Sequence, residues 1–161
     1  MFVLSRRAAI FGLAASLSAC GSRSQGADER IRSDANVLPL HPNETPELRR
    51  LINKYADLYE VPRPLVHRVV IRESTHNPAA RNGPYYGLMQ ILPATARTMG
   101  YRGDAKGLLD AENNLKYAVK YLRGAWLLAD GSFDEAVKWY SRGYYFEAKR
   151  RGLLQETDLR T

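Results

Sequence analysis

Apolar residues recur every three or four positions through most of the chain after residue 44, which is the spacing of amphipathic helices. The first such stretch predicts a helix that Thr45 caps and that continues to Leu58. A second helix should begin near Pro64 and end before the Asn77-Pro78 pair, because proline disfavours helical geometry in the residue before it. The pattern therefore opens with two helices in close succession.

Three more helices are expected in the second half. Pro93 and Gly100 bracket a short helix, and a longer one should run from about residue 111 to residue 129. Ser132 and Glu135 form a capping-box pair at the start of the last helix. This last helix is expected to carry Ala136, Val137, Tyr140 and Tyr144. No strand pattern or internal repeat competes, so the expected fold class is all-α.

The first residues have the composition of an export signal. Arg6 and Arg7 precede an apolar stretch that is too short for a comfortable membrane span, which needs about 20 residues. The segment Leu17-Ser18-Ala19-Cys20-Gly21 resembles the lipobox of bacterial lipoproteins, in which the cysteine is acylated and becomes the mature amino terminus. Residues 1–19 are thus expected to be a lipoprotein-type signal peptide, and Cys20 the lipidation site through which the protein contacts the membrane.

The remaining chain divides into a polar segment and a domain. Residues 20–43 are rich in polar residues and are expected to be a flexible tether, and residues 44–161 to form one catalytic domain. The formal net charge of +7 comes from scattered Lys and Arg residues without a dense basic run, so nucleic acid is not an expected partner. Gly21 after the cysteine is not the aspartate that often retains lipoproteins in the inner membrane. We therefore expect the periplasmic face of the outer membrane in preference to the inner one.

One carboxylate stands out in the second helix. Glu73 follows Val69 by four positions and Val70 by three, so its side chain lies on the apolar face. Partial burial raises the pKa of a carboxyl group and lets it act as a general acid near neutral pH. The alternative is that Glu73 points into water or pairs with Arg72 or Arg68.

The residues around Glu73 form an ordered series of short motifs. Glu73-Ser74 is followed by Asn77-Pro78 and by Gly87-Leu88-Met89-Gln90. Further on come Asn114-Leu115-Lys116-Tyr117-Ala118-Val119-Lys120-Tyr121-Leu122 and Trp139-Tyr140-Ser141-Arg142-Gly143. In order and spacing this series resembles the goose-lysozyme-like soluble lytic transglycosylases, over about residues 44–151.

The resemblance implies an all-α, lysozyme-like fold of the goose type with a groove for peptidoglycan strands. It implies a lytic transglycosylase, a carbon-oxygen lyase that cleaves the β-1,4 bond between MurNAc and GlcNAc and leaves 1,6-anhydroMurNAc ends. Glu73 would be the catalytic acid and then the base, and neither a metal nor another cofactor is needed. The substrate-binding residues that the resemblance implies are Gln90, Met89, Tyr140, Ser74, Gly87 and Ser141.

Several residues depart from the family pattern or have simpler roles. Ser141 stands where asparagine is usual, and the serine that many relatives carry before Gly87 is absent, with Asn82 as the nearest substitute. Met89 and Tyr140 are also typical core residues. The aromatic residues from Trp139 to Phe146 would either stack on sugar rings or, more in keeping with helical spacing, pack inward.

Other ionisable residues leave two questions open. His67 and His76 do not make a metal site by spacing, because no third ligand accompanies them. His76 replaces an aromatic residue that is common at this position in the family. A second carboxylate near Glu73, from Asp104, Asp110 or Glu112, would make a hydrolytic muramidase credible. A further alternative is a catalytically weakened lipoprotein that binds peptidoglycan.

Overall fold

Six α-helices dominate the computed structural model, which describes residues 39–159. The helices are α2 (Pro46–Leu58), α3 (Arg63–Ser74), α4 (Pro93–Thr98), α5 (Ala111–Leu127), α6 (Phe133–Arg142) and α7 (Tyr145–Arg151). A short 3-10 helix, η1 (Ala105–Leu109), precedes α5. The all-α prediction is confirmed. The predicted signal peptide, Cys20 and most of the predicted tether lie outside the described residues.

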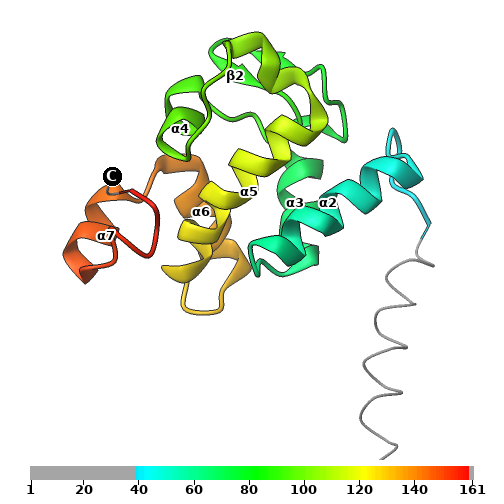
Figure 1. Cartoon of the computed structure of the whole chain (residues 1–161). Coiled ribbons are helices and arrows are strands. Elements are labelled where there is room, and N and C mark those ends of the chain that lie inside the picture. The colour runs from blue at the N-terminus through cyan, green and yellow to red at the C-terminus, as the bar shows by residue number, and fades with distance from the viewer. Residues whose placement is uncertain (1–38, 160–161) are drawn as a thin grey trace, which may run out of the picture. The chain divides into compact units, whose positions relative to one another are not determined.

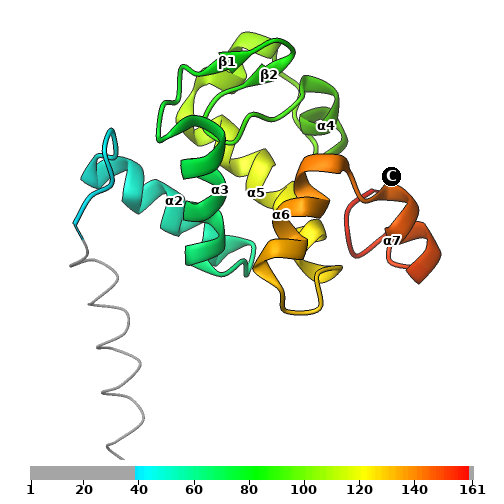
Figure 2. The ribbon, with the colours of Figure 1, turned by 180° about the vertical axis from the view of Figure 1, so that it is seen from behind.

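Helix α5 is the central element of the domain. It contacts α2, α4, α6 and η1, and in both opposite views it crosses the middle of the domain (Figures 1 and 2). Its inward residues are fully buried. They are Leu115, Ala118, Val119, Leu122 and Ala125. Burial of such side chains is the main stabilising contribution, at about 25 cal/mol per Å² of apolar surface.

The helix starts follow the capping residues that the sequence contains. The Thr45 hydroxyl accepts a hydrogen bond from the Leu48 N–H at 3.1 Å, and Ser132 accepts one from the Glu135 N–H at 3.3 Å. The Glu135 carboxylate binds Lys138. Side-chain caps of this kind satisfy backbone donors that have no partner inside the helix.

The predicted last helix is wrong in its extent. Helix α6 ends at Arg142, Gly143 takes a φ of 84°, and a separate helix α7 follows. Tyr144 therefore leaves the line of α6 and donates a hydrogen bond to the Tyr121 carbonyl of α5 at 2.8 Å. A β-carbon at Gly124 would lie 2.2 Å from the Tyr144 hydroxyl. Gly124 thus makes the space that lets the ring pack on α5, and the long helix is interrupted to reach it.

A small antiparallel pair of strands is also present that the hydrophobic pattern did not predict. Strands β1 (Arg81–Asn82) and β2 (Tyr85–Tyr86) pair Arg81 with Tyr86 and Asn82 with Tyr85. Two-residue strands have no periodicity to detect. They shape the loop between α3 and α4, which lies at one end of the domain (Figure 2).

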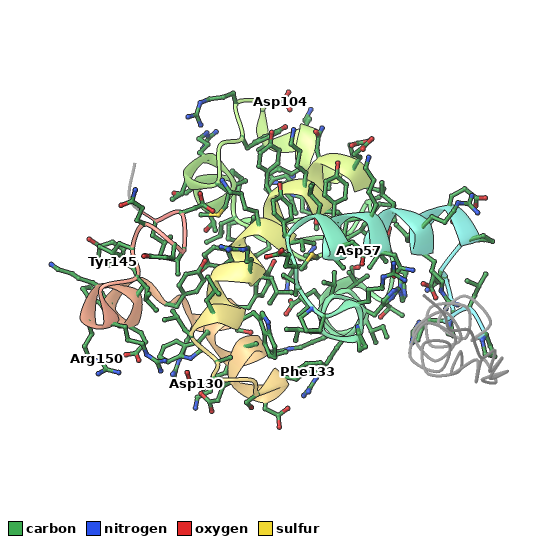
Figure 3. The ribbon with its side chains drawn as sticks, turned by 60° about the horizontal axis from the view of Figure 1, so that its bottom comes forward. Asp57, Asp104, Asp130, Phe133, Tyr145 and Arg150 are labelled. Atoms are coloured by element: carbon green, nitrogen blue, oxygen red, sulfur yellow. The ribbon has the colours of Figure 1, made fainter. Side chains whose placement is uncertain are left out.

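The surface of the described part carries charged side chains at opposite edges. Figure 3 places Asp104 at one edge and Asp130 with Arg150 toward the other. Asp130 pairs with Arg151 at 3.0 Å, an exposed ion pair of a kind that contributes at most about 1 kcal/mol. Within residues 39–159, no helix combines the length and the apolar character that crossing a membrane requires.

Candidate active site

Glu73 lies in the last turn of α3, on the side that faces the core. Val69 and Val70 on the same side are fully buried, whereas the Glu73 side chain keeps 23% of its surface exposed. The helical spacing therefore places the carboxyl group at the edge of the apolar interior. In this position the Glu73 carboxyl group is partly removed from water but remains accessible from the surface.

The surroundings of Glu73 favour its protonated form. Burial raises the pKa of Glu73, and the Arg72 guanidinium, whose Nε lies 3.6 Å from Oε1, partly opposes this rise. Arg68, the other candidate partner, pairs with Asp134. The carboxyl group is thus suited to hold a proton at a higher pH than an exposed glutamate does.

Helix α3 ends abruptly after Glu73. Thr75 and His76 both take left-handed backbone conformations, with φ of 51° and 63°, which is rare for residues other than glycine. The Ser74 hydroxyl donates to the Val70 carbonyl at 3.3 Å. The Ser74 hydroxyl therefore forms a hydrogen bond within the last turn of α3. The predicted contact of Ser74 with substrate stays a prediction.

The Gly-Leu-Met-Gln motif forms a small closed loop, which we call the signature loop (residues 86–91). Tyr86 and Ile91 exchange two backbone hydrogen bonds of 3.1 Å that close it. Gln90 takes a φ of 47°, and its amide donates to the Gly87 carbonyl at 2.8 Å and to the Ala80 carbonyl at 3.2 Å. The Gln90 side chain therefore holds the loop together, whatever it contacts in the substrate.

The Asn114 side chain holds the signature loop in place through hydrogen bonds, a role that we did not assign to it from the sequence. Its buried side chain accepts from the Met89 N–H at 2.9 Å and donates to the carbonyls of Tyr86 and Leu108 at 2.8 and 2.9 Å. Asn114 begins the motif in α5, so the signal was present in the sequence. Its purpose only becomes visible once α5 and the loop are together.

Gly87 is required by the same contact. Its φ is 72°, and a β-carbon there would lie 2.3 Å from the Asn114 amide nitrogen and 2.4 Å from the Leu108 carbonyl oxygen. Such separations are incompatible with a side chain. Gly87 thus allows the signature loop to pack closely against Asn114. The predicted contact of Gly87 with substrate stays a prediction.

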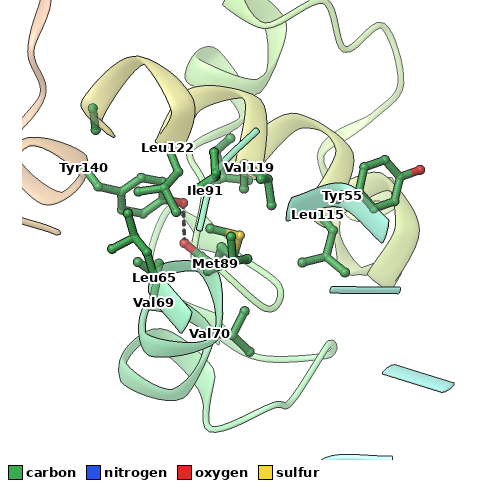
Figure 4. Close-up of a cluster of buried hydrophobic side chains, with 14 of the residues drawn as sticks. Tyr55, Leu65, Val69, Val70, Met89, Ile91, Leu115, Val119, Leu122 and Tyr140 are labelled. Carbon is green, nitrogen blue, oxygen red and sulfur yellow. Dashed lines mark hydrogen bonds between the residues drawn. The ribbon is translucent and has the colours of Figure 1, made fainter. Parts of the chain in front are cut away.

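Met89 and Tyr140 connect the signature loop to α6. The Met89 side chain is fully buried among core residues, and the Tyr140 hydroxyl donates to its carbonyl at 2.8 Å (Figure 4). Burial raises the pKa of Tyr140 well above its usual value, and the negative charge of Glu73 adds to the rise. The charge of Glu73 therefore acts on the Tyr140 hydroxyl through electrostatics.

The predicted residues beyond Tyr140 are less buried. Ser141 is exposed and donates to the Val137 carbonyl at 2.9 Å within α6. The aromatic cluster divides between core and surface, because Tyr144 is buried whereas Phe146 is 83% exposed. Neither expected role of the cluster therefore applies to all of its members.

The other acidic candidates make local contacts of their own. Asp104 accepts from the Gly107 N–H and caps η1, and Asp110 accepts from the Asn113 N–H and caps α5. Glu112 accepts from Lys54 and Tyr55. Among the described residues, Arg72 is the charged group that affects the pKa of Glu73, and none of these three carboxylates contributes to it.

Comparison with known proteins agrees with this arrangement. No solved structure matches the chain. A family model described as "Transglycosylase SLT domain" matches residues 50–155, which is well over half of the chain and includes α3, the signature loop and α5. The chain therefore belongs to the transglycosylase SLT domain family, which has an all-α, lysozyme-like fold and acts on peptidoglycan.

Proposed function

We propose that this protein is a lytic transglycosylase that cleaves the β-1,4 bond between MurNAc and GlcNAc and forms 1,6-anhydroMurNAc ends. One observation carries the proposal: the Glu73 carboxyl group lies at the edge of the core with 23% of its side chain exposed, and burial raises its pKa. An acid that must first give up a proton and then take one back needs this protonated resting state.

The reaction needs only one such group. Glu73 donates its proton to the glycosidic oxygen as the bond to C1 of MurNAc breaks and the GlcNAc end leaves. The resulting carboxylate then removes the proton of the C6 hydroxyl of the same MurNAc, whose oxygen bonds to C1 and closes the anhydro ring. No water is consumed and Glu73 ends protonated. A hydrolase with two carboxyl groups would need a partner within about 5 to 9.5 Å.

The deciding experiment is mass spectrometry of purified peptidoglycan digested by the full-length chain in detergent. We expect anhydro-muropeptides from the wild type and none from Glu73→Gln, whose amide cannot give up a proton. Glu112→Gln is the matched control, because that glutamate is bound to Lys54 and should be dispensable. Reducing ends would instead indicate a muramidase. No products from any variant would favour a protein that only binds peptidoglycan.

The pH dependence provides a second test of the role of Glu73. Since the first step uses the protonated acid, kcat/KM should fall as the pH rises through the raised pKa of Glu73. Arg72 lowers that pKa, so Arg72→Gln should move the falling limb to higher pH. An unchanged limb in Arg72→Gln would argue against Glu73 as the group that titrates.

We further propose that Cys20 is lipidated and holds the domain at the periplasmic face of the outer membrane, in preference to the inner membrane. The lipobox-like segment before Cys20 supports this proposal. Cys20→Ala should release the protein from the membrane fraction, and density-gradient separation of the two membranes should place the wild type. Retention of the variant would contradict the lipid anchor.

A further inference from the structure

All three histidines of the chain lie near one another, close to the turn that follows Glu73. The ring centroid of His76 is 5.0 Å from that of His41 and 6.3 Å from that of His67. Glu44, from the turn before α2, is beside them, with its side chain only 1% exposed. We call Glu44, His67 and His76 the histidine cluster.

His76 is the first sign that a ligand belongs here. Its side chain is completely buried, yet neither ring nitrogen has a hydrogen-bond partner within residues 39–159. Buried polar atoms are nearly always paired, because leaving one unpaired costs about 1–3 kcal/mol. A neutral imidazole has one unprotonated nitrogen whose lone pair can bind a metal ion.

His67 presents a second lone pair to the same place. Its Nε2 lies 3.0 Å from the Asn53 amide oxygen, an acceptor, and therefore carries the ring proton. In the neutral ring, Nδ1 is then the unprotonated nitrogen. This Nδ1 faces Oε1 of Glu44 at 3.6 Å. Two acceptors facing each other repel unless a cation lies between them.

The Glu44 carboxylate can accept one more hydrogen bond, and the free position is on Oε1, the oxygen that faces His67. Oε2 accepts from Arg49 at 2.6 Å and from the His41 N–H at 2.9 Å, whereas Oε1 accepts, among the described residues, only from Arg49 at 3.0 Å. Oε1 also lies 3.7 Å from Nε2 of His76. Hydrogen bonds of this kind stabilise the ionised carboxylate.

The distances fit a metal better than a proton. Separations of 3.6 and 3.7 Å are too long for hydrogen bonds. Two atoms this far apart, each bound to zinc at about 2.05 Å, subtend an angle of about 125° at the ion. The three ligand atoms lie within 4.8 Å of one another, and binding one zinc ion requires each pair to be within about 4.1 Å. An oxygen with two neutral imidazoles is also a common zinc ligand set.

We propose that the histidine cluster binds a divalent transition-metal ion, zinc by its ligand set, through Glu44 Oε1, His67 Nδ1 and His76 Nε2. Water or His41 completes the coordination. The ion fastens the turn before α2 to α3 and to the turn after it, and so has a structural role. It takes no part in the cleavage reaction.

The test measures zinc on the full-length chain, purified in detergent through a tag without histidine and then stripped with a chelator. After addition of Zn²⁺ and gel filtration, we expect one ion per chain in the wild type and in Glu73→Gln. Glu44→Gln combined with His76→Phe should lose at least nine tenths of it. Glu47→Gln is the matched control, because this glutamate lies three residues away and is exposed. Zinc binding by Glu73→Gln separates this proposal from the proposed function.

A second variant protects against misfolding, since Glu44 also holds Arg49. His67→Gln can keep a hydrogen bond to Asn53 while it removes the ligand, and it should lose zinc and the visible spectrum of bound Co²⁺. Zinc should also raise the unfolding temperature of the wild type by several degrees and leave the variants unchanged. The proposal would be overturned if the double variant and His67→Gln both bound zinc like the wild type. It would also be overturned if the wild type bound no zinc.

Discussion

The signature loop and the histidine cluster both bury polar groups, but they satisfy them differently. Asn114 under the loop uses both of its amide atoms in three hydrogen bonds of 2.8 to 2.9 Å. His76 in the cluster is as deeply buried, but neither of its ring nitrogens forms a hydrogen bond within the described residues. A satisfied buried amide fixes a backbone shape by itself, whereas an unsatisfied imidazole indicates that something else completes the site. The comparison suggests where the fold is self-sufficient and where it depends on a ligand.

The largest effect is expected when the satisfied network is removed. Asn114→Ala leaves the Met89 N–H and the carbonyls of Tyr86 and Leu108 without partners, and should lower the free energy of unfolding by about 3–5 kcal/mol. Chemical denaturation would measure this. Asn113→Ala, at the neighbouring and partly exposed position, should cost less than about 1 kcal/mol. Equal losses would mean that the network does not hold the loop.

Gly87 tests the contact between the loop and Asn114 from the other side. Gly87→Ala combines a positive φ with a clash against Asn114 and should cost about 3 kcal/mol or more. Gly83→Ala is the matched control, because its φ is also positive, at 56°, but no atom lies within 4 Å of the added carbon. It should cost only about 1 kcal/mol. Similar losses in thermal unfolding would show that backbone strain alone explains both.

Tyr140 offers a single hydrogen bond to remove. Tyr140→Phe leaves the Met89 carbonyl unpaired and should cost about 1–2 kcal/mol in denaturant unfolding. The hydroxyl of Tyr121 makes no hydrogen bond within the described residues, so Tyr121→Phe should change stability by less than about 0.5 kcal/mol. An equal loss in Tyr121→Phe, which removes a hydroxyl without a hydrogen bond, would mean that the loss in Tyr140→Phe does not come from its hydrogen bond to Met89.

The smallest effect is expected in the histidine cluster when no metal is present. His76→Phe replaces an unpaired buried ring by an apolar one of similar shape, so the metal-free chain should change in stability by no more than about 1 kcal/mol. Calorimetry in chelator would measure it. A loss comparable to that of Asn114→Ala would mean that His76 is already satisfied, and the contrast between the two regions would disappear.

Local sequence patterns were enough to predict much of the fold and the position of Glu73. The spacing from Val69 and Val70 places the carboxyl group at the core edge, and Thr45 and Ser132 cap the helices that they precede. These features depend only on neighbours within a few residues. The family resemblance supplied the roles that local chemistry alone does not.

Features that depend on distant residues were not predictable in this way. The break at Gly143 follows from the fit of Tyr144 onto Gly124, and the role of Asn114 follows from the approach of α5 to the signature loop. The spacing of His67 and His76 along the chain reveals no third ligand, because Glu44 comes within 4.8 Å of them only in the folded structure. Each case requires knowing which segments meet in space.

The turn that carries Glu44 also has a mechanical consequence. Asn43 donates to the Thr75 carbonyl at 3.4 Å, and Glu44 faces His76, so residues 43 and 44 are attached to the left-handed turn just behind Glu73. Any tension that reaches the domain along the chain before residue 40 is applied first at this attachment. A pull on the amino-terminal side of the domain would therefore load the end of α3, and single-molecule stretching should find that the domain begins to unfold there.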